Sequence, residues 1–288
     1  MVKSFIFDTN IITEKNIERL KEEVNLKILS ENNKLIIYGS AATLSETYDC
    51  PRNRSILLKF IFEITNSHYF DFIATILLKE FNIPQNHYYF MLDMQIKELK
   101  EHINTISDSD LSDVKEWKDW KHQRNNRLSK REELKNDYNK IGVNLDRLSD
   151  HERLDLLKMF EQDKIRFAKR ALNIIKNIDL ETKESFLKQY LSGNKSYPYF
   201  NTYVELFTYF WWEVCSNKKK PDPNGLEDMV QLVYLNNVDV IVSEEKKGFL
   251  KGAFDYIYGQ SNLNKEYMDL NEFIEYCQEI QNIVTYAN

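Results

Sequence analysis

Short apolar runs that alternate with helical patterns open this 288-residue chain. Residues 3–7, KSFIF, and 34–38, KLIIY, each end in a short apolar run that is typical of a buried strand. Residues 14–30 follow the first run with helical spacing, and residues 41–49 follow the second, with Ser40 placed as the N-cap of that helix. Strand, helix, strand, helix is typical of an α/β fold with a central parallel sheet flanked by helices.

The same signal returns at the other end of the chain. Residues 223–237 have a helical pattern, and residues 238–243, VDVIVS, follow them as an apolar strand. Residues 265–284 are expected to form a short strand and a final helix. The sheet is therefore predicted to be built from both ends of the chain.

Between these ends the sequence has no strand pattern. From about residue 53 to about residue 215 the apolar spacing is helical almost throughout, and Gly and Pro are rare. We predict an α/β core made of residues 1–52 and 200–288, and a long all-helical insertion at 53–199. The insertion is expected to stand beside the functional edge of the sheet and to be a dedicated substrate, partner or regulatory region. The expected protein partner is either a second copy of this chain or a regulatory protein.

One basic stretch interrupts an acidic chain. The whole chain has 39 Lys and Arg against 45 Asp and Glu, a net charge of −6, whereas residues 115–135 contain eight basic and four acidic residues. The basic positions recur every third residue and spiral around a helix, which favours an ordinary solvated helix. The alternative is a nucleic-acid-facing arm in which Trp117 and Trp120 stack on bases.

Composition argues against several classes of protein. The 3 cysteines are far apart in the sequence and indicate a reducing compartment, and the 5 histidines include no pair with zinc-ligand spacing. The apolar run at the N-terminus is too short for a signal peptide. The aromatic stretch 203–214 contains two glutamates and is too short to cross a bilayer. We therefore expect a cytoplasmic protein that does not bind membranes.

Four acidic residues lie directly after predicted strands or in helices next to strand ends. They are Asp8, Glu46, Asp228 and Glu245. Because functional sites of open parallel sheets form at the carboxyl ends of strands, we expect these acids to converge there. Clustered carboxylates repel one another unless a cation neutralises them, and oxygen-only ligands select Mg²⁺ or Mn²⁺. The sequence thus predicts a two-ion or one-ion metal site in which the four acids are both ligands and catalytic residues.

Alternatives remain for each acid taken alone. A single Asp after a strand is more often a turn or capping residue. Neighbouring acids also compete for three of the four positions: Asp49 for that of Glu46, Asp222 and Glu227 for that of Asp228, and Glu244 for that of Glu245.

The order of these motifs resembles the PIN-domain family of metal-dependent nucleases. FIFDTNII, starting at Phe5, looks like the family's first motif, and IIYGSAATLSETYD, starting at Ile36, looks like the second. NGLEDMVQLVYLNNVDVIVSEEKKGF, starting at Asn224, looks like the third and fourth. The resemblance covers roughly residues 1–50 and 200–288 and implies a parallel sheet between helices, Mg²⁺ or Mn²⁺, and cleavage of RNA.

The resemblance also assigns roles to neighbouring residues. Asp8 would be a metal ligand held by a rigid strand, Asn10 would hold the carboxylate or a phosphate, and Ser243 takes the place of the family's Thr or Ser. Thr9 is expected to be a turn residue. The expected function is a metal-dependent endoribonuclease that acts on RNA or single-stranded DNA. Because Glu245 is one methylene longer than the family's usual Asp, the alternative is a weak or inactive PIN-like module that binds nucleic acid or serves as a protein scaffold.

Overall fold

The computed structural model describes residues 2–48, 53–65, 68–83, 148–175, 178–216, 225–259 and 263–286, with isolated positions between 96 and 136. The basic stretch 115–135, with Trp117 and Trp120, lies outside the described residues. The expectations about this stretch therefore stay predictions.

Within the described residues, a sheet of 5 parallel strands has the order β3-β2-β1-β4-β5. The strands are β1 (Lys3–Phe7), β2 (Leu35–Ser40), β3 (Tyr69–Phe70), β4 (Val240–Val242) and β5 (Glu266–Met268). β1 lies at the centre, between β2 and β4, and its residues Phe5, Ile6 and Phe7 are buried. An apolar run buried on both faces is typical of a central parallel strand. The prediction of an α/β fold with a central parallel sheet is confirmed.

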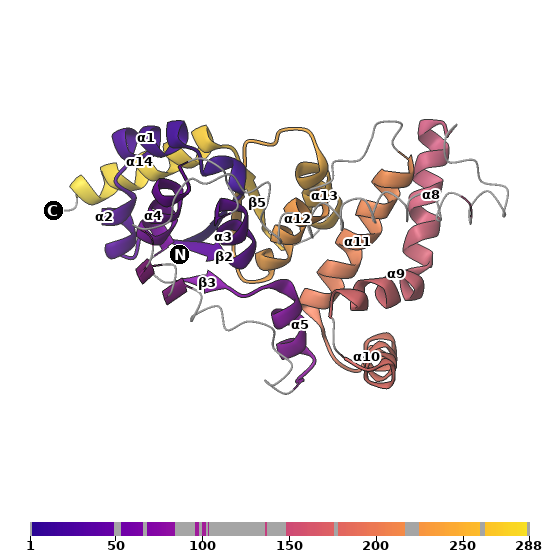
Figure 1. The fold of residues 1–288 in the computed structure, drawn as a ribbon. Helices are drawn as coiled ribbons and strands as arrows, with labels where there is room; N and C mark the ends of the chain where they lie inside the picture. The colour runs from indigo at the N-terminus through magenta and orange to yellow at the C-terminus, as the bar shows by residue number, and fades with distance from the viewer. Residues whose placement is uncertain are drawn as a thin grey trace.

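Helices cover both faces of the sheet, as Figure 1 shows. Phe5 and Phe7 belong to the core of one face, and Ile6 between them belongs to the core of the other, as alternation along a strand requires. The first face packs against α1 (Glu14–Glu23), α2 (Leu26–Glu31), α3 (Ala41–Tyr48), α4 (Arg54–Thr65) and α14 (Leu270–Tyr286). The second packs against α5 (Ile73–Glu80), α11 (Pro198–Ser216), α12 (Gly225–Val230), η5 (Gln231–Asn236) and α13 (Phe249–Tyr258).

The predicted helix at 14–30 is two helices. α1 ends at Glu23, and α2 starts after Asn25, whose side chain accepts a hydrogen bond from the backbone N–H of Ile28 at 3.1 Å. Asn is a strong N-cap, so it begins a new helix at this point. In this second helix Ile28 is 48% exposed.

The expectation that residues 53–215 contain no strand is wrong at β3. Tyr69 and Phe70 pair with Gly39 and Ser40 of β2 in parallel. A strand of two residues is too short to produce an alternating pattern, so the sequence gives no periodic signal for it. Helix α4, which precedes β3, packs in the same core as β1 and β2.

The C-terminal elements follow the predicted order with one difference. The strand at 238–243 is β4, and residues 265–284 form β5 and α14. The helical stretch at 223–237 is divided into α12 and a 3-10 helix, η5. Residues 223 and 224, at the start of this stretch, lie outside the described residues.

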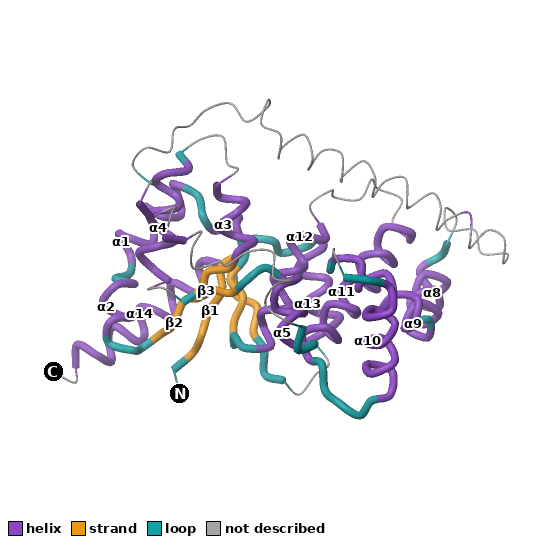
Figure 2. Tube along the Cα trace, turned by 60° about the horizontal axis from the view of Figure 1, so that its bottom comes forward, coloured by secondary structure: helices purple, strands orange, loops and turns teal. Residues whose placement is uncertain are grey.

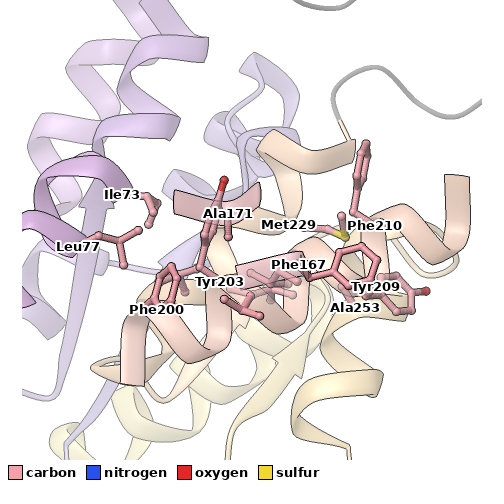
Figure 3. Close-up of a cluster of buried hydrophobic side chains, with 14 of the residues drawn as sticks. Ile73, Leu77, Phe167, Ala171, Phe200, Tyr203, Tyr209, Phe210, Met229 and Ala253 are labelled. Carbon is pink, nitrogen blue, oxygen red and sulfur yellow. The ribbon is translucent and has the colours of Figure 1, made fainter. Parts of the chain in front are cut away.

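A second group of helices extends away from the sheet, as seen on the right of Figure 2. It consists of α8 (Asp150–Gln162), α9 (Lys164–Ala171) and α10 (Leu180–Ser192), which pack with α11. Figure 3 shows that Phe167 of α9 and Phe200 and Phe210 of α11 share one apolar cluster with Leu77 of α5. None of the helices in the described part of the chain has the length and apolarity needed to cross a bilayer.

Glu80 joins the two groups of helices at their boundary. Its carboxylate, at the end of α5, accepts hydrogen bonds from the backbone N–H groups of Tyr199 and Phe200, both at 2.9 Å, in the first turn of α11. These N–H groups have no partner within their own helix, so a carboxylate supplied by another element caps α11. Burial raises the pKa of Glu80 above its ordinary value, although the two backbone hydrogen bonds oppose this increase.

This raised pKa predicts a pH-dependent effect of Glu80→Gln. A carboxyl group with a raised native pKa stabilises the fold fully below its unfolded pKa and loses that contribution as the pH rises through the native value. Gln does not titrate. The free energy of unfolding of the variant, relative to wild type, is therefore expected to rise between about pH 4.5, the ordinary pKa, and neutral pH. Urea denaturation across this range measures the difference, and a pH-independent difference would contradict the prediction.

Candidate functional site

The chain changes direction across the sheet between β1 and β4. From β1 it continues to β2 on one side, whereas β4 continues to β5 on the other side. In open parallel sheets, ligand sites lie beyond the carboxyl ends of the strands at such a switch point. β1 ends at Phe7 and is followed by Asp8, and β4 ends at Val242 and is followed by Ser243. These two polar residues therefore lie at the expected place for a site.

Asp8 is buried and held by hydrogen bonds on both carboxylate oxygens. Its Oδ1 accepts from the backbone N–H of Thr9 at 2.8 Å and from Nε2 of Gln231 at 3.2 Å. Its Oδ2 accepts from the Ser243 hydroxyl at 2.7 Å. A carboxylate has about four acceptor positions. These three donors thus fix the orientation of the group and leave room for one further partner.

The charged form of Asp8 is disfavoured by its surroundings. Burial, with 4% of the residue exposed, raises its pKa above the ordinary value. The hydrogen bonds from Ser243, Thr9 and Gln231 oppose this rise, and the nearby charge of Glu245 adds to it. A buried carboxyl beside another acid is an environment in which a bound cation would stabilise the charged form.

Ser243 connects the two strand ends. Its hydroxyl donates to Asp8, and its oxygen accepts from Nδ2 of Asn10 at 3.0 Å and from the backbone N–H of Glu245 at 3.1 Å. The side-chain oxygen of Asn10 in turn accepts from the backbone N–H of Glu244 at 3.1 Å. Asn10 is therefore connected to Asp8 indirectly, by hydrogen bonds through Ser243. The sequence had predicted that Asn10 hydrogen-bonds directly to the carboxylate or to a phosphate.

We expect Ser243→Ala to lower the free energy of unfolding by about 1–3 kcal/mol, the cost of leaving buried polar partners unsatisfied. The serine is 1% exposed, so water does not replace the lost hydroxyl. Urea denaturation measures the effect, with Ser192→Ala at the exposed end of α10 as the matched control. Equal stability of the two variants would mean that the Ser243 network contributes nothing to the fold.

Glu46 lies on the same edge of the sheet as Asp8. It projects from α3, the helix that follows β2, and Ser40 caps this helix by accepting from the backbone N–H of Thr43 at 3.0 Å, as predicted. The Thr9 hydroxyl donates to the Glu46 carboxylate, while the Thr9 N–H donates to Asp8. Thr9, expected to be only a turn residue, therefore joins two of the four predicted acids. The rival Asp49 lies outside the described residues.

Glu245 is close to Asp8, but its carboxylate is bonded elsewhere. Its Oε1 accepts from the backbone N–H of Leu250, at the start of α13, at 2.8 Å. The carboxylate lies against Gly248, where an added Cβ would be 2.3 Å from Oε1, so a glycine is needed for this approach. The rival Glu244 is exposed, and its backbone N–H donates to Oδ1 of Asn10.

Asp228 lies on α12, and its side chain is outside the part that the structure describes. The side chain of its rival Glu227 is also outside that part, as is Asp222. The backbone of α12 leads directly into η5, whose first residue, Gln231, contacts Asp8. Asp228 thus stays a predicted member of the site.

Gln231 is the residue of the site that the sequence reasoning missed. It is the single polar side chain in the run MVQLVYL, and a buried polar residue within an apolar run is the signal that could have identified it. Gln231 is fully buried. Tyr267 of β5 was also missed; its hydroxyl donates to the backbone carbonyl of Glu245 at 2.7 Å.

The atoms around Asp8 fit a hard divalent cation in their chemical type. Asp8, Glu46 and Gln231 present carboxylate and amide oxygens, which Mg²⁺ and Mn²⁺ prefer. Oε1 of Gln231 is buried without a hydrogen-bond partner. Among the described residues, no group of three or more Asp, Glu, His or Cys side chains has the arrangement of a metal site. The amide oxygen of Gln231 is thus a further oxygen of this chemical type beside Asp8.

Comparison with known proteins gives no relative. No family model, no curated protein and no solved structure matches this chain.

Proposed function

We propose that this protein is a PIN-like, metal-dependent endoribonuclease of the cytoplasm. The observation that carries the proposal is the position of Asp8: a buried carboxylate at the switch point of a parallel sheet, held on both oxygens. The order of the four acidic motifs in the sequence supports the same activity. RNA is the proposed substrate, and single-stranded DNA the second substrate to test.

Asp8, Glu46 and Asp228 would hold the Mg²⁺ or Mn²⁺ ion, and Glu245 would join them if its carboxylate turned from the N–H of Leu250 towards the ion. When bound, the ion supplies an activated water and positive charge for attack on a phosphodiester. Ser243 and the Thr9 backbone fix the Asp8 carboxylate, so the ligand is oriented before the ion arrives. The Thr9 hydroxyl fixes Glu46 in the same way.

Cleavage of a mixed pool of RNA and single-stranded DNA tests the proposal. The full chain is incubated with Mn²⁺, with Mg²⁺ or with a chelator, and fragments are separated by length. Asp8→Asn is the inactive control, and Asp155→Asn, in an exposed ion pair on α8, is the matched substitution away from the sheet. Cleavage that needs a metal and Asp8 supports the proposal; cleavage that survives Asp8→Asn rejects it.

The geometry of Glu245 favours a second function, a PIN-like module that binds nucleic acid or serves as a protein scaffold. Its carboxylate caps α13 through the N–H of Leu250. If this hydrogen bond persists, the ion has one ligand fewer. A chain that binds RNA but neither binds Mn²⁺ nor cleaves would support this module.

A further inference from the structure

The fully buried side chain of Gln231 has a nitrogen that makes a hydrogen bond and an oxygen that makes none. Its Nε2 donates to Asp8 Oδ1 at 3.2 Å, and its Oε1 has no hydrogen-bond partner within the described structure. The oxygen and nitrogen of an amide are separated by only about 2.2 Å, as their bonds to one carbon require. The unpaired oxygen therefore lies beside the Asp8 carboxylate.

The buried oxygen has a cost that an apolar residue would avoid. An unpaired buried acceptor destabilises a fold, and native proteins contain few of them. The flanking residues Met229, Leu232 and Val233 are all buried apolar side chains of the same core. The core itself gives no reason for an amide at position 231, so the reason must come from the site.

The oxygen has the chemistry of a cation ligand. Hard divalent ions accept Gln carbonyl oxygens, and Mg²⁺ also keeps water molecules that donate to nearby acceptors. A neutral oxygen suits this position, because Asp8 already experiences the charge of Glu245 and a further carboxylate would increase the repulsion.

We propose that the side-chain oxygen of Gln231 binds the hydrated divalent cation at Asp8. This inference rests on the cation of the proposed function and adds a neutral residue to its predicted acidic ligands. The Gln231 amide then has two tasks: its N–H orients Asp8, and its oxygen contacts the ion or one of the ion's water molecules.

Two substitutions separate these tasks. Gln231→Met keeps the length of the side chain and removes both the donor and the acceptor. Gln231→Glu keeps an oxygen, removes the N–H donor and adds a charge. Gln278→Met, at an exposed position of α14, is the matched control.

The readout is Mn²⁺ binding without RNA, measured by the electron paramagnetic resonance of free Mn²⁺ and by the Mn²⁺-induced rise in melting temperature. We expect Gln231→Met to weaken Mn²⁺ binding about 10- to 100-fold, the range for residues that support a metal site. Without Mn²⁺, its melting temperature is expected to change little, because removal of the unpaired oxygen offsets the loss of the N–H donor to Asp8. Gln231→Glu is expected to bind Mn²⁺ at least as tightly as wild type, and Gln278→Met to behave as wild type.

Two results would overturn the inference without contradicting the proposed nuclease function. The first is a Mn²⁺ affinity of Gln231→Met within twofold of that of wild type. The second is a Mn²⁺ affinity of Gln231→Glu as low as that of Gln231→Met. The second result would assign Gln231 a positioning role through its N–H alone. Wild type that does not bind Mn²⁺ overturns this inference and the proposed metal dependence together. Wild type that binds Mn²⁺ through Gln231 and cleaves no RNA supports this inference and rejects only the nuclease.

Discussion

Asp8→Asn is expected to lower the rate of metal-dependent RNA cleavage by about a hundred- to a thousandfold. The amide has nearly the shape of the carboxylate, so the hydrogen bond from the Thr9 N–H can persist, whereas the Ser243 hydroxyl, whose oxygen already accepts from Asn10 and Glu245, loses its acceptor. The charge that attracts the cation is lost. Loss of several kcal/mol of electrostatic stabilisation corresponds to this reduction in rate, at about 1.4 kcal/mol per factor of ten.

In the absence of metal, the free energy of unfolding of the same variant is expected to rise relative to that of wild type as the pH increases. Burial raises the pKa of Asp8, so the stability that this group contributes is greatest at low pH and falls as the pH rises through the raised value. Asparagine does not carry this penalty at pH 7. Added Mn²⁺ should raise the melting temperature of wild type and should raise that of Asp8→Asn less. Equal Mn²⁺ shifts would show that Asp8 is not a ligand.

Phe273→Ala is expected to reduce the free energy of unfolding by about 3–5 kcal/mol, the usual cost of removing a buried phenylalanine. Phe273 of α14 is fully buried, with ring-centre distances of 5.1 Å to Phe5 and 5.0 Å to Phe7. Its edges meet the faces of both rings of the central strand, an arrangement favoured by aromatic electrostatics. The cavity therefore opens directly against β1.

Urea denaturation measures this loss, and Glu279→Ala on the exposed side of α14 is the control. The control is expected to change the free energy of unfolding by less than about 0.5 kcal/mol, as surface substitutions usually do. Because Phe7 immediately precedes Asp8, Phe273→Ala is also expected to weaken Mn²⁺ binding. A loss below about 1 kcal/mol would mean that α14 does not support β1.

The long apolar runs of the sheet were predictable from the sequence, and the short elements were not. The apolar residues of β1 and all of β4 are buried on both faces, and β2 has four consecutive apolar residues that are buried or half-buried. β3 has two residues, so only its pairing with β2 identifies it. The division of residues 14–30 depends on the capping preference of one side chain, Asn25, within a continuous helical pattern.

The site was predictable where it depends on strand ends, and less so where it depends on packing. Asp8 and Ser243 follow strands, so topology alone brings them to one edge. The contact of Gln231 with Asp8 requires the path of η5, which helical periodicity does not specify. The direction of the Glu245 carboxylate depends on its close approach to Gly248 and on its hydrogen bond from the N–H of Leu250. Both contacts depend on the folded path of the chain and leave no pattern in the sequence.

The position of β1 between β2 and β4 also bears on the order of events during synthesis. Asp8 and Ser243 are 235 residues apart, so most of the chain must leave the ribosome before their hydrogen bond can form. Until then, β1 can pair with β2 but has an open edge on its other side, a known risk for association with other chains. A fragment that stops before β4 would have an unfinished sheet and no site. Any metal-dependent cleavage by this protein would therefore begin only after Ser243 has left the ribosome.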